Sequence, residues 1–109
     1  NEVLKGLAEA AADCTRDSDI LARWGGEEFL LVAPETALAG AEELAEKLRV
    51  RVAGRVFPQV GKVTISLGVA QLGAEETADA VVKRADDALY RAKEGGRDRV
   101  EPDRGDAAA

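Results

Sequence analysis

Apolar residues recur at the spacing of an α-helix in three stretches of the chain. The first stretch predicts an amphipathic helix over residues 2 to about 15. The second predicts a helix from Ala37 to about Val52, with Thr36 as its N-cap. The third predicts a helix that begins after another N-cap, Thr77, and ends at the "EGG" sequence, where glycine follows a cationic last turn.

Two apolar runs flank a glycine pair and predict an antiparallel β-hairpin. They are "ILARW", residues 20–24, and "EFLLVAP", residues 28–34. Proline lacks a backbone N–H group, so Pro34 is expected to end the second strand. The hairpin would place its glycine pair and the acidic residues that follow at an exposed turn.

A third strand is predicted in the β-branched run "VTISLGVAQL", residues 63–72. Gly68 inside this run indicates a bulge or a close approach of another segment. The preceding segment "GRVFPQVGK", residues 54–62, is expected to be a loop. The sequence "DRV", residues 98–100, is expected to form a short last strand.

The order of these elements predicts the fold class. Helix, strand, strand, helix, strand, helix and short strand favour an α/β (α+β) domain, with helices packed on a mixed, largely antiparallel sheet. Residues 1–101 would form this domain, and residues 102–109 a flexible tail of small and polar residues. The chain begins inside a helical pattern and without methionine, so it is expected to be a fragment of a longer protein.

Composition and charge narrow the function classes. The net charge is −6, which disfavours a general nucleic-acid binder, because such proteins need a basic face. The absence of histidine removes the usual general base and the commonest zinc ligand. The single cysteine, Cys14, forms no disulfide within the chain, which favours a reducing, cytoplasmic location. No apolar run is long enough to span a membrane.

The turn "GGEE" is the first candidate site. Gly25 and Gly26 would let the backbone approach a ligand closely. Glu27 and Glu28 supply the hard oxygen atoms that Mg²⁺ takes together with substrate phosphates. Taken alone, the same four residues are more typical of an exposed hairpin tip.

Two further groups of charged residues each allow two interpretations. Lys93 and Arg97 flank a glycine pair, where they could offset the helix dipole or hold a polyphosphate. In "RDSD", Arg16 and Asp19 could cap the ends of secondary structure. They could equally bind a phosphate and a guanine edge.

Three motifs, "ARWGGEEF", "VTISLGVA" and "ADDALYRAKEGGRDRV", resemble in order and spacing the GGDEF family of diguanylate cyclases. The turn is a Gly-Gly-Glu-Glu-Phe variant, and the resemblance runs from "NEVLKGLA" to Val100. It implies a sheet like those of nucleotidyl cyclases and polymerase palms. It also implies condensation of two GTP molecules to cyclic di-GMP and pyrophosphate, with Mg²⁺ or Mn²⁺, by two domains that meet in a homodimer.

The resemblance implies roles for residues of the catalytic turn and of the last helix. Glu27 would bind the catalytic metal, and Glu28 would lie near the metal and the attacking 3′-hydroxyl. Gly25 and Gly26 would admit the α-phosphate. The remaining phosphates would be held by two cations, Lys93 and Arg97.

It also implies a product-inhibition site away from the turn, formed by Arg16 and Asp19. Lys47 falls where some members use a supporting arginine; it keeps the charge but lacks the planar fork. Asn1 falls where the family has a guanine-binding aspartate.

The family places a central strand and a helical segment before the point where this chain starts. That part carries another metal-binding aspartate and an asparagine that recognises guanine. The chain is therefore expected to be N-terminally truncated, inactive by itself, and preceded by a sensor or receiver domain. The alternative hypothesis is a regulatory module that binds cyclic di-GMP without catalysis.

Overall fold

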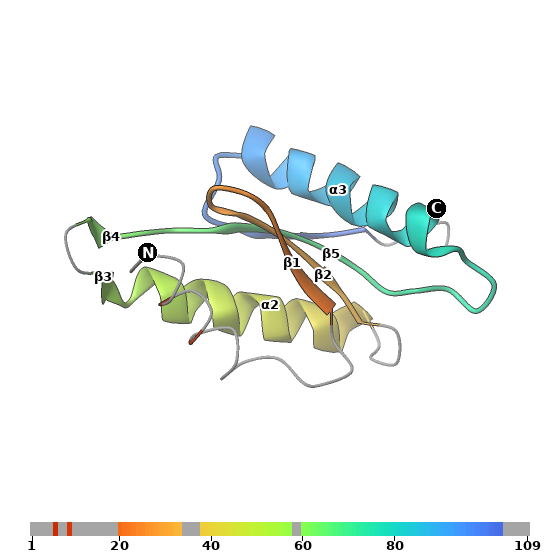
Figure 1. Ribbon diagram of the computed structural model, residues 1–109, viewed down its shortest axis with the longest axis horizontal. Coiled ribbons are helices and arrows are strands. Elements are labelled where there is room, and N and C mark those ends of the chain that lie inside the picture. Colours follow the sequence, from red (N-terminus) through yellow and green to blue (C-terminus); the bar gives the residue numbers. More distant parts are fainter. Residues whose placement is uncertain (1–5, 7–8, 10–19, 34–37, 58–59, 104–109) are drawn as a thin grey trace.

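The computed structural model describes residues 6, 9, 20–33, 38–57 and 60–103 (Figure 1). Gly6 and Glu9 are helical, as expected for the first predicted helix. The rest of that helix, the N-cap Thr36 and residue Pro34 lie outside the described residues.

Four strands form the main sheet in the order β1-β2-β5-β6. They are β1 (Ile20–Gly25), β2 (Glu28–Val32), β5 (Ser66–Ala70) and β6 (Val100–Pro102). Helix α2 (Leu38–Ala53) lies on one face of this sheet and α3 (Ala78–Glu94) on the other (Figure 1). The mixed α/β fold, with a sheet flanked by helices, confirms the fold class expected from the sequence.

The pairing of the strands differs from expectation in one respect. β1 and β2 pair antiparallel, as the predicted hairpin requires, but β2–β5 and β5–β6 are parallel. Each parallel pair is joined by a crossover that contains a helix, α2 in the first and α3 in the second. The expectation of a largely antiparallel sheet is therefore wrong for the main sheet.

The core has two layers because β2 is buried on both faces. Phe29 and Leu31 pack in the cluster under α2, whereas Leu30 and Val32 pack in the cluster under α3. Such a strand reads as a continuous apolar run, as expected for a strand with a parallel neighbour that is covered on both sides.

Helix α3 begins and ends as the sequence predicts. The Thr77 side chain accepts a hydrogen bond of 3.1 Å from the Ala80 N–H group, which confirms Thr77 as the N-cap. At the other end, Gly95 is the C-cap, and its N–H group donates to the Arg91 carbonyl at 2.9 Å. The helix is therefore fixed between Thr77 and the glycine pair that precedes Arg97.

Gly68 brings α3 directly onto β5. A Cβ atom at Gly68 would lie 2.0 Å from the Ala85 carbonyl oxygen and 2.5 Å from the Leu89 nitrogen. Strand pairing continues through Gly68 without a register shift. Of the two expectations for this glycine, the close approach is confirmed.

Residues 54–62 were expected to be a loop, but they contain the short strands β3 (Val56–Phe57) and β4 (Gly61–Lys62). These two strands pair antiparallel in a separate hairpin. Phe57 is buried in the core, and Gly61, the first residue of β4, has a positive φ of 79°, which glycine adopts without strain. Burial of Phe57 depends on residues far away in the chain, so the local pattern does not reveal it.

Both later strands also differ in extent from expectation. β5 is confined to five residues, and β6 begins at Val100 and includes Pro102. Proline is tolerated there because β6 is an edge strand. The Asp103 N–H group donates to the Val69 carbonyl at 2.8 Å, so sheet contacts extend past the expected domain boundary at residue 101. In the described part of the chain, no helix has the length and apolar character needed to cross a membrane.

Candidate functional site

The tip of the β1–β2 hairpin carries the two glycines and the two acidic residues. Gly25 is the last residue of β1 and pairs with Glu28, the first residue of β2, so Gly26 and Glu27 form the turn. A register shift between Arg23 and Gly25 marks a bulge just before it. The Arg23 Nε donates to the Gly26 carbonyl at 3.1 Å. The two carboxylates therefore differ in environment, because Glu27 is exposed on the turn and Glu28 is half-buried on a strand.

The two glycines also differ in their surroundings. A Cβ atom at Gly25 would lie 2.9 Å from the Glu28 Oε1 atom, so glycine leaves room for that carboxylate. A Cβ atom at Gly26 would meet nothing within 4 Å, and Gly26 has no positive φ. The fold itself therefore does not require glycine at position 26, and the space above this residue is open.

Two cations converge on Glu28 from the C-terminal end of α3. The Lys93 Nζ lies 3.3 Å from Glu28 Oε1, and the Arg97 Nη1 lies 3.9 Å from Glu28 Oε2. The Glu28 side chain is 23% exposed, that of Lys93 32% and that of Arg97 63%. The structure thus brings together one acid and two cations that the sequence singled out separately, although Glu28 and Lys93 are 65 positions apart.

The turn that presents Arg97 has an unusual backbone. Arg97 and Asp98 have positive φ values of 62° and 46°, in the left-handed region that non-glycine residues rarely adopt. Each such residue costs on the order of 1–3 kcal/mol, and persists only where surrounding contacts hold it. The Arg97 N–H group donates to the Ala92 carbonyl at 2.9 Å, which anchors the start of this turn to α3.

Ser66, which the sequence interpretation missed, lies between the two halves of the site. Its N–H group donates to the Glu27 carbonyl at 3.0 Å, and its Oγ accepts from the Asp98 N–H group at 3.2 Å. Arg49 on α2 donates to the Asp98 carboxylate at 2.9 Å. The available signal for Ser66 was a serine inside the β-branched run "VTISLGVA", where Thr64 is the other polar residue. No comparable local signal pointed to Arg49.

Comparison with known proteins decides the family. The family model described as "Diguanylate cyclase, GGDEF domain" matches residues 1–99. The chain belongs to the GGDEF family. Diguanylate cyclase DgcM of Escherichia coli strain K12 is 48% identical over 100 residues, which are 92% of this chain. The chain spans about a quarter of the length of that relative, 24%.

Solved GGDEF structures agree with the fold. The GGDEF domain of DgcB from Caulobacter crescentus, in complex with c-di-GMP, has a TM-score of 0.76 and 31% identity. That match covers 92% of this chain and 62% of the other. The active GGEEF domain of a diguanylate cyclase from Vibrio cholerae also has a TM-score of 0.76, with 30% identity, over 94% of this chain and 67% of the other.

Metal binding by this GGDEF domain can be tested against the side chains that are present. Across the described ranges, no three acidic, histidine or cysteine residues are grouped closely enough to hold a metal by themselves. Glu27 and Glu28 supply two adjacent carboxylates. Mg²⁺ usually takes one or two carboxylates and completes its shell with water and substrate phosphates. The residues therefore fit a metal shared with a phosphate ligand.

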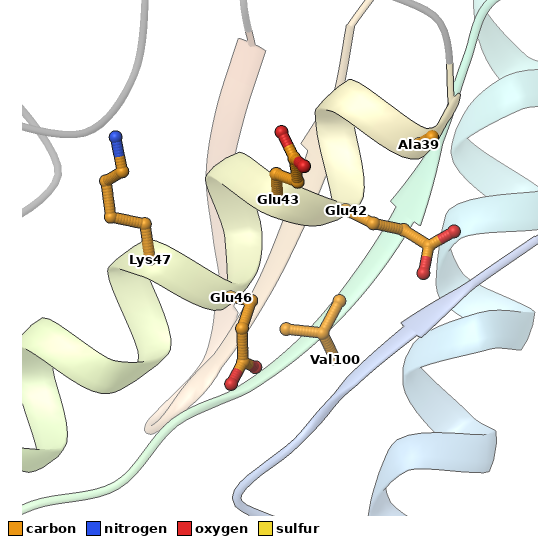
Figure 2. Close-up of a pocket in the computed structure, with 6 residues that line it drawn as sticks. All are labelled: Ala39, Glu42, Glu43, Glu46, Lys47 and Val100. Atoms are coloured by element: carbon orange, nitrogen blue, oxygen red, sulfur yellow. The ribbon is translucent and has the colours of Figure 1, made fainter.

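The expected product-inhibition residues are largely outside the described part of the chain. Arg16 and Asp19 lie there, as does Asn1. Lys47 is exposed on α2, where it borders an open cavity of about 660 Å³ with three acidic neighbours, Glu42, Glu43 and Glu46. Figure 2 shows the Lys47 side chain directed away from Val100, on the opposite border of this cavity.

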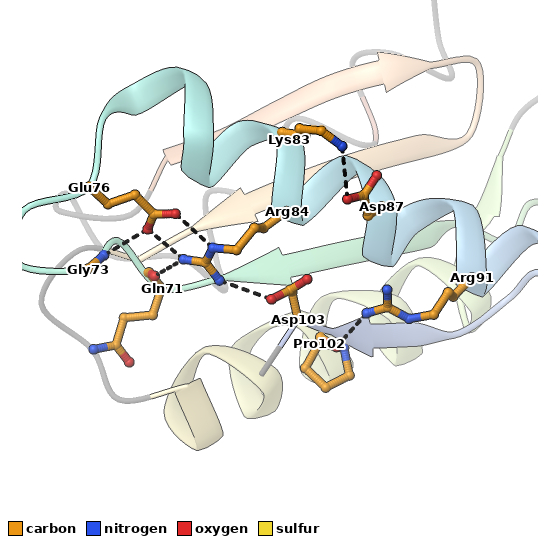
Figure 3. Close-up of polar contacts among 9 residues, drawn as sticks. All are labelled: Gln71, Gly73, Glu76, Lys83, Arg84, Asp87, Arg91, Pro102 and Asp103. Carbon is orange, nitrogen blue, oxygen red and sulfur yellow. Dashed lines mark hydrogen bonds and ion pairs between the residues drawn. The ribbon is translucent and has the colours of Figure 1, made fainter. Parts of the chain in front are cut away.

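A second charged cluster lies in the N-terminal half of α3 (Figure 3). Arg84 donates to both carboxylate oxygens of Glu76, at 2.6–2.8 Å, to the Gln71 carbonyl at 2.7 Å and to Asp103 at 3.1 Å. The Gly73 N–H group also donates to Glu76, at 3.0 Å. The hydrogen bonds from Arg84, and then that from Gly73, lower the pKa of Glu76 to about 2.

Proposed function

We propose that the protein containing this GGDEF domain is a diguanylate cyclase. It would condense two GTP molecules to cyclic di-GMP and release two pyrophosphates. The observation that supports this most directly is the convergence of Glu28, Lys93 and Arg97 beside the open backbone at Gly26. Membership of the family and the names of its relatives point the same way.

The two cations and the turn would each bind a different part of the triphosphate. Lys93 would act as a point charge on the β- and γ-phosphates, and the Arg97 fork would add paired hydrogen bonds. The open space at Gly26 would receive the α-phosphate close to the backbone. Because Glu28 already contacts both cations, an incoming triphosphate would replace its carboxylate as their counter-ion.

Glu27 and Glu28 would hold Mg²⁺ or Mn²⁺. The metal would lower the pKa of the 3′-hydroxyl group and balance charge on the phosphates. In each of two steps, the 3′-oxygen of one GTP would form a bond to the α-phosphorus of the other. The bond to pyrophosphate would break, and the hydroxyl proton would be lost. Two domains would face each other as a homodimer, because each would present one GTP.

The test is incubation of purified full-length protein with GTP and Mg²⁺ or Mn²⁺, followed by chromatography of the products. Cyclic di-GMP and pyrophosphate in a 1:2 ratio are expected, from the balanced equation. Binding of cyclic di-GMP without turnover of GTP would favour the alternative, a non-catalytic regulatory module.

The 109-residue chain is proposed to be inactive by itself, or far weaker than the full protein. In its described part no third acidic, histidine or cysteine residue joins Glu27 and Glu28 in a metal-binding group, and the chain spans 24% of its relative DgcM. The asparagine that the family uses to recognise guanine would come from the rest of the protein. Asn1 stands where the family has a guanine-binding aspartate, so this contact would be altered. Robust cyclic di-GMP synthesis by a purified chain of 11.5 kDa would contradict this proposal.

Product inhibition through Arg16 and Asp19, with Lys47 in support, is the regulatory part of the proposal. The solved DgcB domain in complex with c-di-GMP supports a product-binding role in the family. Arg16→Ala should weaken cyclic di-GMP binding by at least about tenfold, because a charge-assisted hydrogen bond contributes roughly 1.5–3 kcal/mol. Calorimetric titration measures this, and equal affinities would leave "RDSD" as a charged turn.

The proposal has two further parts. A sensor or receiver domain would precede this GGDEF domain, and the protein would be located in the cytoplasm. Both follow from the need for a signal and for cellular GTP. Fractionation of cells that express the tagged full-length protein would test the location.

A further inference from the structure

We infer that Ser66 is a positioning residue for Arg97. Ser66 would set the spacing between the turn that carries the acidic residues and the turn that presents the phosphate-binding arginine. This inference rests on the proposed binding of a triphosphate by Arg97, and it assigns to Ser66 no contact with substrate.

Ser66 is placed to join the two turns. It is the first residue of β5, which lies between β2 and β6 in the sheet. Its backbone N–H group holds the Glu27 carbonyl, and its hydroxyl holds the Asp98 N–H group. One residue therefore fixes the acidic turn through its main chain and the cationic turn through its side chain.

The Ser66 hydroxyl is buried, which makes its hydrogen bond to the Asp98 N–H group important for the position of the turn. Ser66 is 3% exposed and is the only polar side chain among the buried residues of the described part. A buried hydroxyl is shielded from water, so the Asp98 N–H group takes the place of hydration at the Ser66 Oγ atom. Removal of the hydroxyl would therefore leave the Asp98 N–H group without this acceptor.

The left-handed turn supplies the reason that such an acceptor matters for Arg97. Arg97 and Asp98 keep positive φ values only while their contacts hold them. Arg97 is held by the Ala92 carbonyl and by the Arg99 Nε, which donates to the Arg97 carbonyl at 3.3 Å. Asp98 is held by Ser66 and Arg49. Without the Ser66 hydroxyl, Asp98 loses its contact with β5, although the Leu67 N–H group still donates to the Arg99 carbonyl at 3.0 Å. The Arg97 fork would then be held less firmly opposite Glu28.

A purely structural hydroxyl would behave differently in one measurable way. It would change stability, and its effect on triphosphate binding would be the same whether or not Arg97 is present. A residue that acts through Arg97 loses its effect once Arg97 is removed. A double-mutant cycle separates the two possibilities.

The experiment measures the affinity of full-length protein for inorganic triphosphate with Mg²⁺, by calorimetry. The four proteins are wild type, Ser66→Ala, Arg97→Ala and the double variant. Each single substitution should weaken binding about five- to tenfold, and the double variant should bind no more weakly than Arg97→Ala. Equal affinity of Ser66→Ala and wild type, or independent effects that multiply, would overturn the inference.

Two further variants keep the test decisive. Ser66→Thr retains the hydroxyl and should keep most of the affinity, whereas Thr64→Ala removes an exposed hydroxyl two residues earlier and should change nothing. If Ser66→Ala fails to fold, Arg49→Gln releases the same Asp98 from α2. It should also lose its effect in the Arg97→Ala background, and independent effects would overturn the inference.

The outcomes also distinguish this inference from the proposed function. If the wild type makes cyclic di-GMP but Ser66→Ala binds triphosphate normally, only the positioning role fails. If the wild type binds neither triphosphate nor GTP, both fail together.

Discussion

At the N-terminal half of α3, Arg84 uses Nε and both terminal nitrogens in four hydrogen bonds of 2.6–3.1 Å. Just beyond the C-terminal end of α3, Arg97 approaches Glu28 only at 3.9 Å, and its side chain is 63% exposed. Both arginines face carboxylates, and both join segments that are distant in the sequence. They differ in how much of their hydrogen-bonding capacity the protein itself uses.

We interpret the Arg84 cluster as structural, and the Arg97 position as one that leaves hydrogen-bonding capacity for a ligand. Arg84 ties the β5–α3 connection and the end of β6 to the helix, and its fork is occupied (Figure 3). Arg97 keeps a fork that a phosphate can meet with paired hydrogen bonds. An arginine and a carboxylate in proximity are therefore not enough to indicate a site, because the contacts must leave capacity for a ligand.

The largest effect is expected for Glu28→Gln in the full-length protein. Loss of a metal ligand should cost several kcal/mol in the transition state, or roughly 10²–10³-fold in turnover. Stability should change by no more than about 0.5 kcal/mol, because the contacts to Lys93 and Arg97 are long and partly exposed. Glu75→Gln, at an exposed acid in a loop, is the control. Normal synthesis of cyclic di-GMP by Glu28→Gln would remove this residue from the reaction.

Arg84→Met should lower the stability of the fold but leave the binding of GTP unchanged. It leaves Glu76, Asp103 and the Gln71 carbonyl without their shared donor, so the free energy of unfolding should fall by about 2–3 kcal/mol. The KM for GTP should stay unchanged. Urea denaturation and steady-state kinetics measure the two quantities.

Lys83→Met is a matched control for this substitution. Lys83 precedes Arg84 and forms an exposed pair with Asp87 at 3.3 Å, which is expected to contribute about 0.3–0.5 kcal/mol. If Arg84→Met raised the KM without loss of stability, the contrast between the two ends of α3 would be wrong.

Arg97→Gly should change stability and binding in opposite directions. Glycine adopts positive φ without strain, so the free energy of unfolding should rise by about 0.5–1 kcal/mol. Triphosphate affinity should fall about tenfold, because one charge-assisted contact is lost. Thermal unfolding and calorimetry would show this, and a variant that is both less stable and fully competent to bind would contradict it.

The smallest effect is a pH dependence at the Arg84 cluster. The pKa of Glu76 is lowered from 4.5 to about 2, so its ionised form stabilises the folded protein above pH 4.5. This contribution is lost as pH falls from 4.5 towards 2. Glu76→Gln should therefore be less stable than wild type by about 1 kcal/mol near neutral pH, discounted for solvent screening. The difference should shrink as pH falls from 4.5 and disappear only below pH 2. A difference that does not depend on pH would contradict the ionic role.

Local patterns predicted the elements whose signals lie within a few residues. Thr77, the glycine pair after Glu94 and the β1–β2 hairpin were found in this way. Glu28, Lys93 and Arg97 were proposed from turn chemistry and from the family resemblance. Their meeting is a long-range event that neither helical spacing nor strand alternation encodes.

What was missed depends on contacts between distant parts of the chain. The β3–β4 hairpin requires burial of Phe57, and the parallel pairing requires both helical crossovers. Ser66 reaches Asp98 over 32 positions, and Arg84 reaches Asp103 over 19. In each case a polar or short segment looks unremarkable in the sequence until the folded chain supplies its partner.

The contact at Gly68 has a consequence for motion. Because α3 rests on the β5 backbone with no room for a Cβ atom at Gly68, we expect the helix to move little relative to the sheet. Any opening and closing of the proposed phosphate site would then come from residues 95–99, which follow the helix. Backbone amides in the middle of β5 and α3 should exchange hydrogen for deuterium only through global unfolding, whereas those of residues 95–99 should exchange faster and slow down when a triphosphate binds.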